Sequence, residues 1–448
     1  MALAQSDSLS LLADLIAKAK AAGADAADAV LFDAASLALS QRLGKPERLE
    51  RAEAGDLGLR VFIGRRMAMV SSSDRRPDAL AELVDRATAM ARSVPEDPHC
   101  GLAEPDQLAR DVADLDLSDP DEPTAERLIA LARTAEEAAL AVDGVSNSEG
   151  AEAHWSRTEI AMAASNGFAG GYAISGNSLA VSVIAGEGTA METDYDYTTA
   201  VYAADMDDAA AIGRRAGDKV VARLGARKVD TARVPVVFDP RVAGGLLRHL
   251  TGAISGPSIA RGTSFLKDAM GQQIFAPGIV VVDDPHRRRG LRSKPFDGEG
   301  VANRRHNIIE DGHLTTWLLD LRSARQLGLQ TTGHAARGTA SPPGPSSTNL
   351  YLEPGAQTPD ALIGEIDRGL YVTQMMGMGV SQVTGDYSRG ASGFWIEKGE
   401  RVHPVNEVTI AGNLKDMFKA LTPASDLTFR YGIDAPTLRI DGMTVAGR

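Results

Sequence analysis

The sequence of 448 residues contains one cysteine, few aromatic side chains and no long apolar run. Because Cys100 has no second cysteine to pair with, an intramolecular disulfide is excluded and a reducing compartment suits the chain. No apolar run approaches the roughly 20 residues that cross a bilayer, so we expect no membrane-spanning segment. Residues 1–23 lack the basic start of a signal peptide and show the spacing of a surface helix, so we expect a cytoplasmic protein.

The sequence also lacks an excess of positive charge. Its formal net charge is −13, from 47 Lys and Arg against 60 Asp and Glu, without a basic domain or tail. Such a surface repels phosphate backbones on average, so we expect no direct binding of nucleic acid. The one basic run, His286–Arg289, stands close to Asp283 and Asp284 and is typical of a solvated loop.

Histidine pairs at helical spacing are absent as well. None of the eight histidines lies three, four or five residues from another, which excludes a helix-borne pair of zinc ligands. A metal site assembled from distant segments, such as His249 with His334, stays open. Most unpaired histidines are nevertheless structural.

The 45 glycines and 44% apolar residues that are present indicate a globular protein rich in turns and sheet. We predict an α+β fold with two domains, residues 1–225 and 226–448. The first domain begins as a layer of helix, antiparallel meander and helix, and the meander has short strands separated by tight turns. The helices are expected at 9–22 and 77–93, and the strands at 29–32, 37–42, 47–52, 57–63 and 67–72.

Residues 93–123 are rich in Pro and Asp and are predicted to be a linker-like excursion over the surface. Longer strands follow a third helix, with turns at 165–167 and 176–177, and a helix over 207–224 ends the domain. The second domain is predicted to be a largely antiparallel sheet, curved into a barrel-like or sandwich form. Its main strands are expected at 369–376, 379–384, 390–397 and 401–410.

A strand–helix unit at 234–255 opens the second domain. Asp239 supplies a helix cap, and Pro240 follows where the missing N–H costs nothing. Such a helix is a plausible platform for metal-assisted hydrolysis, but it offers only His249, next to Arg248. A lone imidazole beside a guanidinium does not hold zinc, so we interpret His249 as a structural or interface residue.

A second candidate segment, Gly385–Gly393, combines an acid, hydroxyls and a base among glycines. A hydrolase site here would need a general base beside Ser388, and the sequence shows none. Exposed amides among glycines could instead approach a peptide or a partner. A β-bulge or a turn is the structural alternative. The candidate residues of the segment are Asp386, Tyr387, Ser388 and Arg389.

Motifs of the C-terminal half follow one another as ARGTSF (260–265), SKPFDGEGV (293–301), DGHLTTWLLD (311–320), SARQLGLQTTGHA (323–335), VSQVTGDYSRGASGFWIEKGE (380–400) and EVTIAGNLKDM (407–417). In this order they resemble the PmbA/TldE branch of the TldD/PmbA family, whose members also carry an older label as modulators of DNA gyrase. TldD-type proteins have a His-Glu-x-x-x-His zinc motif on the corresponding helix and a cysteine near the C-terminus. In this sequence the two histidines fall on Arg248 and Ala253, the glutamate falls on His249, and Tyr431–Asp434 contains no cysteine.

The resemblance implies a subunit of a cytoplasmic two-subunit metallopeptidase that acts on unfolded peptides. It implies no catalytic residue, metal ligand or cofactor in this chain, because zinc is expected in a TldD-like partner. We expect Arg248, His249 and residues 386–389 to contact the peptide or the partner. Arg248 and His249 could steady substrate carbonyls or a C-terminal carboxylate, and a free sheet edge could bind the extended peptide.

Two other functions stay open. A homodimeric scaffold or regulatory protein would have no peptidase role at all. An autonomous metal-dependent peptidase would require zinc bound by the isolated chain.

Overall fold

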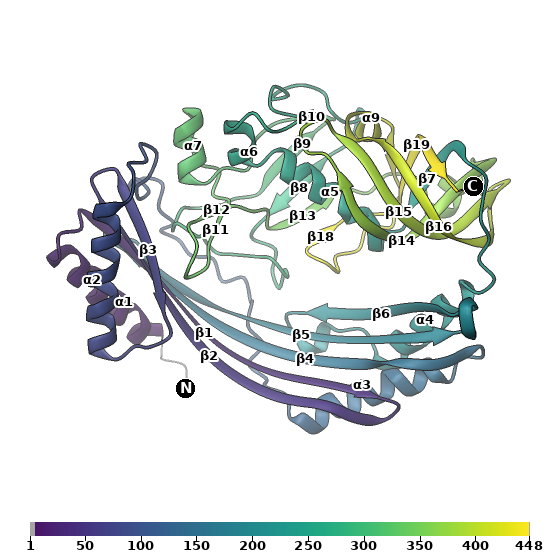
Figure 1. The fold of residues 1–448 in the computed structure, drawn as a ribbon, viewed down its shortest axis with the longest axis horizontal. Coiled ribbons are helices and arrows are strands. Elements are labelled where there is room, and N and C mark those ends of the chain that lie inside the picture. Colours follow the sequence, from purple (N-terminus) through teal and green to yellow (C-terminus); the bar gives the residue numbers. More distant parts are fainter. Residues whose placement is uncertain (1–4, 448) are drawn as a thin grey trace.

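The N-terminal half builds one antiparallel sheet with the strand order β3-β2-β1-β4-β5-β6 (Figure 1). The computed structural model describes residues 5–447. Each strand pairs antiparallel with its neighbours in this sheet, and the β1–β2, β2–β3 and β4–β5 connections are tight hairpins. The strands are β1 (Ala26–Arg42), β2 (Lys45–Ile63), β3 (Arg66–Ser72), β4 (Val145–Ala164), β5 (Ala169–Ala185) and β6 (Glu192–Ala200).

The strands are longer than predicted because two expected turns do not exist. Gly55 and Asp56 pair with Asp33 and Phe32 inside a continuous ladder, so the prediction of separate short strands is wrong. A Cβ at position 55 would meet the guanidinium of Arg75, which binds Asp33, so this side chain would have to shift to admit a larger residue. The predicted turn at 176–177 is also wrong, since both residues lie within β5.

Four helices cover one face of this sheet, and alternation along β1 shows which face it is. Ala29 and Leu31 pack beneath α1 (Gln5–Ala21) and α2 (Pro77–Ser93). Leu37, of the same parity, packs with α3 (Ala125–Leu140) and α4 (Ala209–Ala222). Val30 has the opposite parity and packs with Phe168 and Phe296, so the other face meets the C-terminal half.

The segment between α2 and α3 also lies against the C-terminal half. The Ala109 N–H donates to the carbonyl of Gly300, and the Leu117 carbonyl accepts from Ser175 of β5. Leu117 is buried. This segment therefore contacts both halves of the molecule, whereas its role as a linker and the domain boundary at residue 225 stay predictions.

The C-terminal half is organised around a closed barrel of five strands. The order β16-β15-β14-β7-β19 closes through pairing of β16 with β19. The β7–β14 pair is parallel and the other pairs are antiparallel. The strands are β7 (Ala232–Phe238), β14 (Arg368–Val380), β15 (Asp386–Glu397), β16 (Glu400–Asn413) and β19 (Leu438–Ala446), with β17 (Leu421–Pro423) beside β19. The predicted α+β fold with a largely antiparallel, barrel-like C-terminal half is confirmed.

Helix α5 (Pro240–Ala253) lies between the barrel and a second sheet (Figure 1). Asp239 caps it as predicted, because its side chain accepts from the Arg241 N–H at 3.0 Å. Leu246, Leu247 and Leu250 are buried in the core that joins the two sheets. The second sheet consists of β10 (His313–Leu314), β9 (His306–Glu310), β8 (Val281–Asp284), β13 (Asn349–Leu352) and β18 (Ile433–Asp434).

Shorter elements complete the C-terminal half: α6 (Gly256–Ala260), α7 (Leu321–Leu327), α8 (Pro359–Gly364), α9 (Leu414–Lys419), β11 (Ala335–Ala336) and β12 (Gly344–Pro345). The predicted strand 369–376 and the first two residues of the predicted strand 379–384 form one strand, β14, whose pairing with β15 shifts register near Gly377. The prediction of strand up to residue 384 is wrong, because β14 ends at Val380 and residues 382–384 form a turn. Gly377 has a φ of 79°, so a local irregularity replaces the predicted break. Within residues 5–447, none of the helices has the length and apolar character needed to cross a membrane.

Candidate functional site

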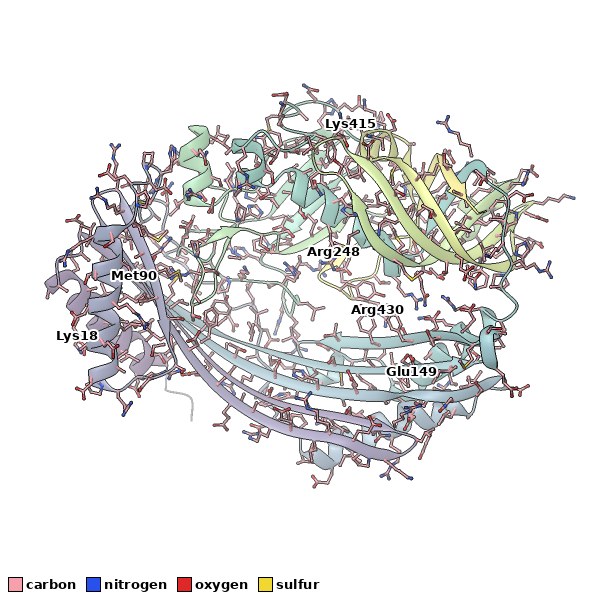
Figure 2. The ribbon with its side chains drawn as sticks, in the orientation of Figure 1. Lys18, Met90, Glu149, Arg248, Lys415 and Arg430 are labelled. Carbon is pink, nitrogen blue, oxygen red and sulfur yellow. The ribbon has the colours of Figure 1, made fainter. Side chains whose placement is uncertain are left out.

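A pocket of about 500 Å³ lies between α5 and the N-terminal sheet. Arg248 points from α5 into the space between the two halves, and Glu149 of β4 lies on the opposite side (Figure 2). Residues of α5, β14 and β15 form one wall, and residues of β4, β5 and β6 form the other. The lining residues include Glu149, Ser182, Asp194, Tyr195, Arg241, Arg248, Gln374, Met375, Met376 and Arg389.

The first turn of α5 is fastened directly to β6. Arg241 Nη1 donates to Asp194 Oδ1 at 2.8 Å and to the Tyr195 carbonyl at 3.2 Å, while Nε donates to the Thr373 carbonyl at 3.1 Å. Asp194 is buried, and its other oxygen lies 3.7 Å from Arg223 Nη1. A largely buried ion pair with several hydrogen bonds fixes the positions of the two pocket walls relative to each other.

His249 lies on the side of α5 that faces β15. Its ring meets the Tyr387 ring edge to face, with centroids 5.8 Å apart. Its Nε2 atom is buried without a hydrogen-bond partner among residues 5–447. Burial, and then the charge of Arg389, lower the pKa of His249. The imidazole is therefore neutral at neutral pH.

The six residues predicted to contact peptide or partner divide into two groups. Tyr387 and Arg389 share a strand face toward α5, where His249 packs against Tyr387 and Arg248 lines the same pocket as Arg389. Asp386 and Ser388 have the opposite parity and are exposed. The Asp386 carboxylate accepts from Thr384 Oγ1 at 2.6 Å and from Asn413 Nδ2 at 3.0 Å. Strand alternation therefore separates these two residues from the pocket.

The side chains at α5 do not fit a zinc ion. The helix presents one imidazole, with Arg248 beside it and Arg389 across from it, and cations repel a metal ion. In the described part of the chain, no group of three or more His, Cys, Asp or Glu side chains could hold a metal ion. The distant His334 has other partners, with Nε2 3.2 Å from Asp283 Oδ2 and Nδ1 2.8 Å from Thr332 Oγ1.

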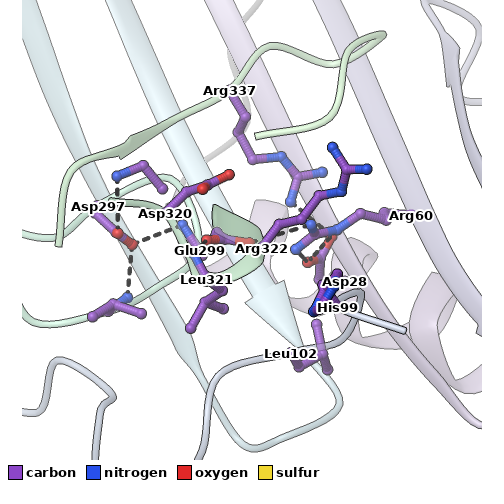
Figure 3. Close-up of polar contacts among 12 residues, drawn as sticks. Asp28, Arg60, His99, Leu102, Asp297, Glu299, Asp320, Leu321, Arg322 and Arg337 are labelled. Atoms are coloured by element: carbon purple, nitrogen blue, oxygen red, sulfur yellow. Dashed lines mark hydrogen bonds and ion pairs between the residues drawn. The ribbon is translucent and has the colours of Figure 1, made fainter. Parts of the chain in front are cut away.

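A buried ionic cluster that the sequence analysis missed joins the two halves (Figure 3). Asp28 of β1 accepts from Arg60 Nε at 2.9 Å and from Arg337 Nη1 at 2.7 Å. Arg60 Nη1 also lies 3.4 Å from Glu299 Oε1. The other carboxylate oxygen of Glu299 accepts from the Leu321 N–H at 2.9 Å. Burial acts to raise the pKa of Asp28, but Arg337 and Arg60 outweigh it and the pKa is lowered.

Asp297 lies next to this cluster and behaves oppositely. It accepts from the N–H groups of Glu299, Val301 and Ala335. Burial, and then the charge of Glu299, raise its pKa to about 7. Two signals could have located these residues: the acids within SKPFDGEGV, and Arg60 within the otherwise apolar run 57–63, where a buried arginine requires a counter-ion.

Comparison with known proteins shows which family shares this architecture. Models of PmbA/TldA metallopeptidases match residues 27–91 (domain 1), 118–224 (central domain) and 231–447 (C-terminal domain). Metalloprotease PmbA of Escherichia coli O157:H7 is 39% identical over 426 residues, covering 95% of this chain and 93% of that protein.

Two solved structures share the fold. A candidate modulator of DNA gyrase from Bacteroides thetaiotaomicron has a TM-score of 0.90 at 26% identity, covering 98% of both chains. TldE from Thermococcus kodakarensis has a TM-score of 0.88 at 21% identity, covering 98% of this chain and 100% of that one. The matched models and the identity along nearly the whole chain show that this protein belongs to the PmbA/TldD family.

Proposed function

We propose that this chain is a non-catalytic subunit of a cytoplasmic two-subunit metallopeptidase. A TldD-like partner supplies the zinc, and this chain forms part of the chamber that holds an unfolded peptide. The observation that carries the proposal is the composition of α5. The resemblance aligns zinc-motif positions with Arg248, His249 and Ala253, and the one imidazole among them is neutral and packed against Tyr387.

The pocket beside α5 supports a role in peptide binding. It combines the charged side chains of Arg248, Arg389 and Glu149 with the flexible apolar side chains of Met375 and Met376. Methionine adapts to differently shaped neighbours, which suits a chamber that accepts varied sequences. Charged groups at its rim can hydrogen-bond the exposed backbone of an extended chain.

Strand addition at β6 does not fit this chamber, although β6 is an edge of its sheet. The carbonyls of Tyr195 and Tyr197 already accept from Arg241 and Arg430, at 3.2 Å and 3.0 Å. An incoming peptide would have to displace both guanidiniums. We therefore assign peptide contact to pocket side chains and not to this sheet edge.

Reconstitution tests the proposal. The chain is mixed with a TldD-like protein from the same genome that carries the His-Glu-x-x-x-His motif, and assembly is measured by size-exclusion chromatography with light scattering. Hydrolysis of an unfolded peptide is then assayed for each protein alone and for the mixture. Elemental analysis measures zinc in each isolated protein.

We expect a stoichiometric complex, hydrolysis that depends on the mixture, and zinc only with the partner. A stable homodimer that neither binds the partner nor changes its hydrolysis would establish the scaffold function instead. Peptide hydrolysis by the isolated chain with one zinc per chain would show an autonomous peptidase. Either of these results would overturn the proposal.

A further inference from the structure

A second cavity, of about 260 Å³, lies where the N-terminal sheet meets the loop before residue 295. Tyr172 and Ser175 of β5 line one side. Arg292, Ser293 and Lys294 line the other, with Ser347 at its edge. None of the residues that line this cavity carries a carboxylate. The cavity is therefore bordered by two cations and no acid.

Arg292 lacks a counter-ion at this position. Its Nε donates to the Thr348 carbonyl and its Nη2 to the Ser347 carbonyl, each at 3.1 Å, and Nη2 also lies 3.4 Å from Ser346 Oγ. All three acceptors are neutral. Within residues 5–447, its Nη1 atom has no hydrogen-bond partner, so this nitrogen of the guanidinium can donate to a ligand.

Lys294 is the second unpaired cation. It is half-buried, and its Nζ atom has neither a hydrogen bond nor an ion pair with any described residue. Burial lowers its pKa, as it also lowers that of Arg292. Partial burial of these two charges without a counter-ion is unfavourable, and a bound anion would reduce that cost.

The acids whose charges act on these two cations, Asp283 and Asp297, already have other hydrogen-bond partners. Asp283 accepts from the N–H of Thr348 at 2.7 Å, from its hydroxyl at 2.6 Å, and from His334. Asp297 accepts three backbone N–H groups, and its raised pKa leaves it partly protonated at neutral pH. Neither carboxylate neutralises Arg292 or Lys294 through direct contact.

Tyr172 adds a neutral donor to the same cavity. Its ring meets Phe296 edge to face, with centroids 5.4 Å apart, and its hydroxyl has no hydrogen-bond partner in the described chain. Burial raises its pKa to about 12, so the hydroxyl keeps its proton. Three donors, from Arg292, Lys294 and Tyr172, thus border a space that offers no acidic acceptor.

Arg248, which lines the pocket beside α5, is a third cation in this region. The charge of Arg248 is near enough to contribute to the lowered pKa of Arg292. In a chain with a net charge of −13, Arg248, Arg292 and Lys294 are three cations without an ion pair in residues 5–447. A chain held beside α5 could therefore place an anionic end in the smaller cavity.

We propose that the cavity bordered by Tyr172, Arg292 and Lys294 binds a carboxylate, and that this carboxylate is the C-terminus of the peptide in the chamber. The volume admits one residue with its carboxylate but excludes a folded domain. The anion site stands on the cavity itself, whereas the identity of its ligand as a peptide rests on the proposed function.

Direct binding to the isolated full-length chain tests this site without any need for hydrolysis. A short fluorescent unfolded peptide is titrated in two forms, with a free C-terminal carboxylate and with a C-terminal amide, and inorganic phosphate serves as a competitor. The variants are Lys294→Met and Tyr172→Phe. Lys415→Met is the matched control, because Lys415 is exposed on α9, far from this cavity (Figure 2).

We expect the acid to bind about tenfold more tightly than the amide, which corresponds to about 1.4 kcal/mol. The preference should disappear in Lys294→Met, fall in Tyr172→Phe and persist in Lys415→Met. Phosphate should displace the acid from the wild type and lose this ability in Lys294→Met.

Equal binding of acid and amide by the wild type would overturn the proposal. So would a preference that survives in Lys294→Met, or phosphate that binds at Lys294 without competing with the acid. If the mixture with the TldD-like protein fails to hydrolyse peptide while the acid preference persists, the site stands and the proposed function falls. If the mixture hydrolyses peptide but the wild type shows no preference for the free carboxylate, the proposed function stands and the anion site is rejected.

Discussion

Arg60 of β2 and Glu299 of the C-terminal half meet inside the protein, with Nη1 and Oε1 3.4 Å apart and both side chains almost fully buried. The two residues are far apart in sequence, and Asp28 and Arg337 complete the cluster around them. The two halves are thus joined by charges that water does not screen, and each charge depends on its partners.

The Asp28→Asn substitution should strongly destabilise the protein. It keeps the side-chain shape but leaves the buried guanidiniums of Arg60 and Arg337 without the carboxylate that both contact. We expect a loss of about 3–5 kcal/mol in the free energy of unfolding, measured by urea titration. Arg48→Met, which breaks an exposed pair with Glu50, is the control and should change little. A loss no larger than that of the control would contradict an essential role of the cluster.

Asp297 should make stability depend on pH. Its pKa is raised by burial and by Glu299 from 3.8 to about 7, so the folded state holds the proton more tightly than the unfolded chain. Its contribution is therefore fully present below about pH 3.8 and is lost as the pH rises through about 7. The raised pKa of Glu299 acts in the same direction.

Asp297→Asn isolates this effect, because it removes the titrating group at nearly constant size. The free energy of unfolding of the wild type should fall between about pH 5 and pH 8, and the variant should show a shallower slope. The slope is the decisive measurement, since the amide also alters the hydrogen bond from Ala335. Parallel slopes for the two proteins would exclude Asp297 as the titrating group.

His249→Phe should preserve the hydrolysis that the proposed complex carries out. A general base contributes about 10²–10⁴-fold to a reaction rate, whereas we expect kcat/KM to change by less than about tenfold. Stability should hold or rise, because the substitution removes a buried Nε2 atom that lacks a partner. A loss of about 100-fold, with a changed pH profile, would identify His249 as a catalytic base.

Lys294→Met should stabilise the isolated chain, since a half-buried cation without a counter-ion is replaced by an apolar side chain of similar length. The peptide with a free carboxylate should raise the Tm of the wild type more than that of the variant. At 100 times Kd, a ligand stabilises the native state by about 2.7 kcal/mol. Thermal unfolding with and without peptide provides the measurement, and an equal increase in both proteins would count against the anion site.

The local features of this fold could be predicted because they depend on neighbouring residues. The hairpin turns at Gly44 and Gly64 have positive φ, which glycine tolerates, and both glycines fall between predicted strands, after 37–42 and after 57–63. The same logic failed at Gly55, where glycine accommodates the side chain of Arg75 and not a turn. Glycine occurs both where the backbone turns with positive φ and where a neighbouring side chain approaches closely, and the spacing of glycines in the sequence does not distinguish these two cases.

Features that depend on contacts between distant segments were harder to predict from the sequence. Closure of the barrel depends on β16 pairing with β19, and nothing in either strand alone specifies that contact. The predicted contact residues near α5 were separated by strand alternation, which could have been applied once β15 was extended back to Asp386. Arg292 and Lys294 were not singled out, because a cation without a counter-ion is visible only when all of its spatial neighbours are known.

The capping of β6 by Arg241 and Arg430 also bears on how the free chain behaves in solution. An exposed strand edge is a template on which further copies can polymerise. Guanidiniums bonded to the Tyr195 and Tyr197 carbonyls obstruct that template, and the closed barrel offers none of its own. The free chain would be protected at these two places from forming fibrils.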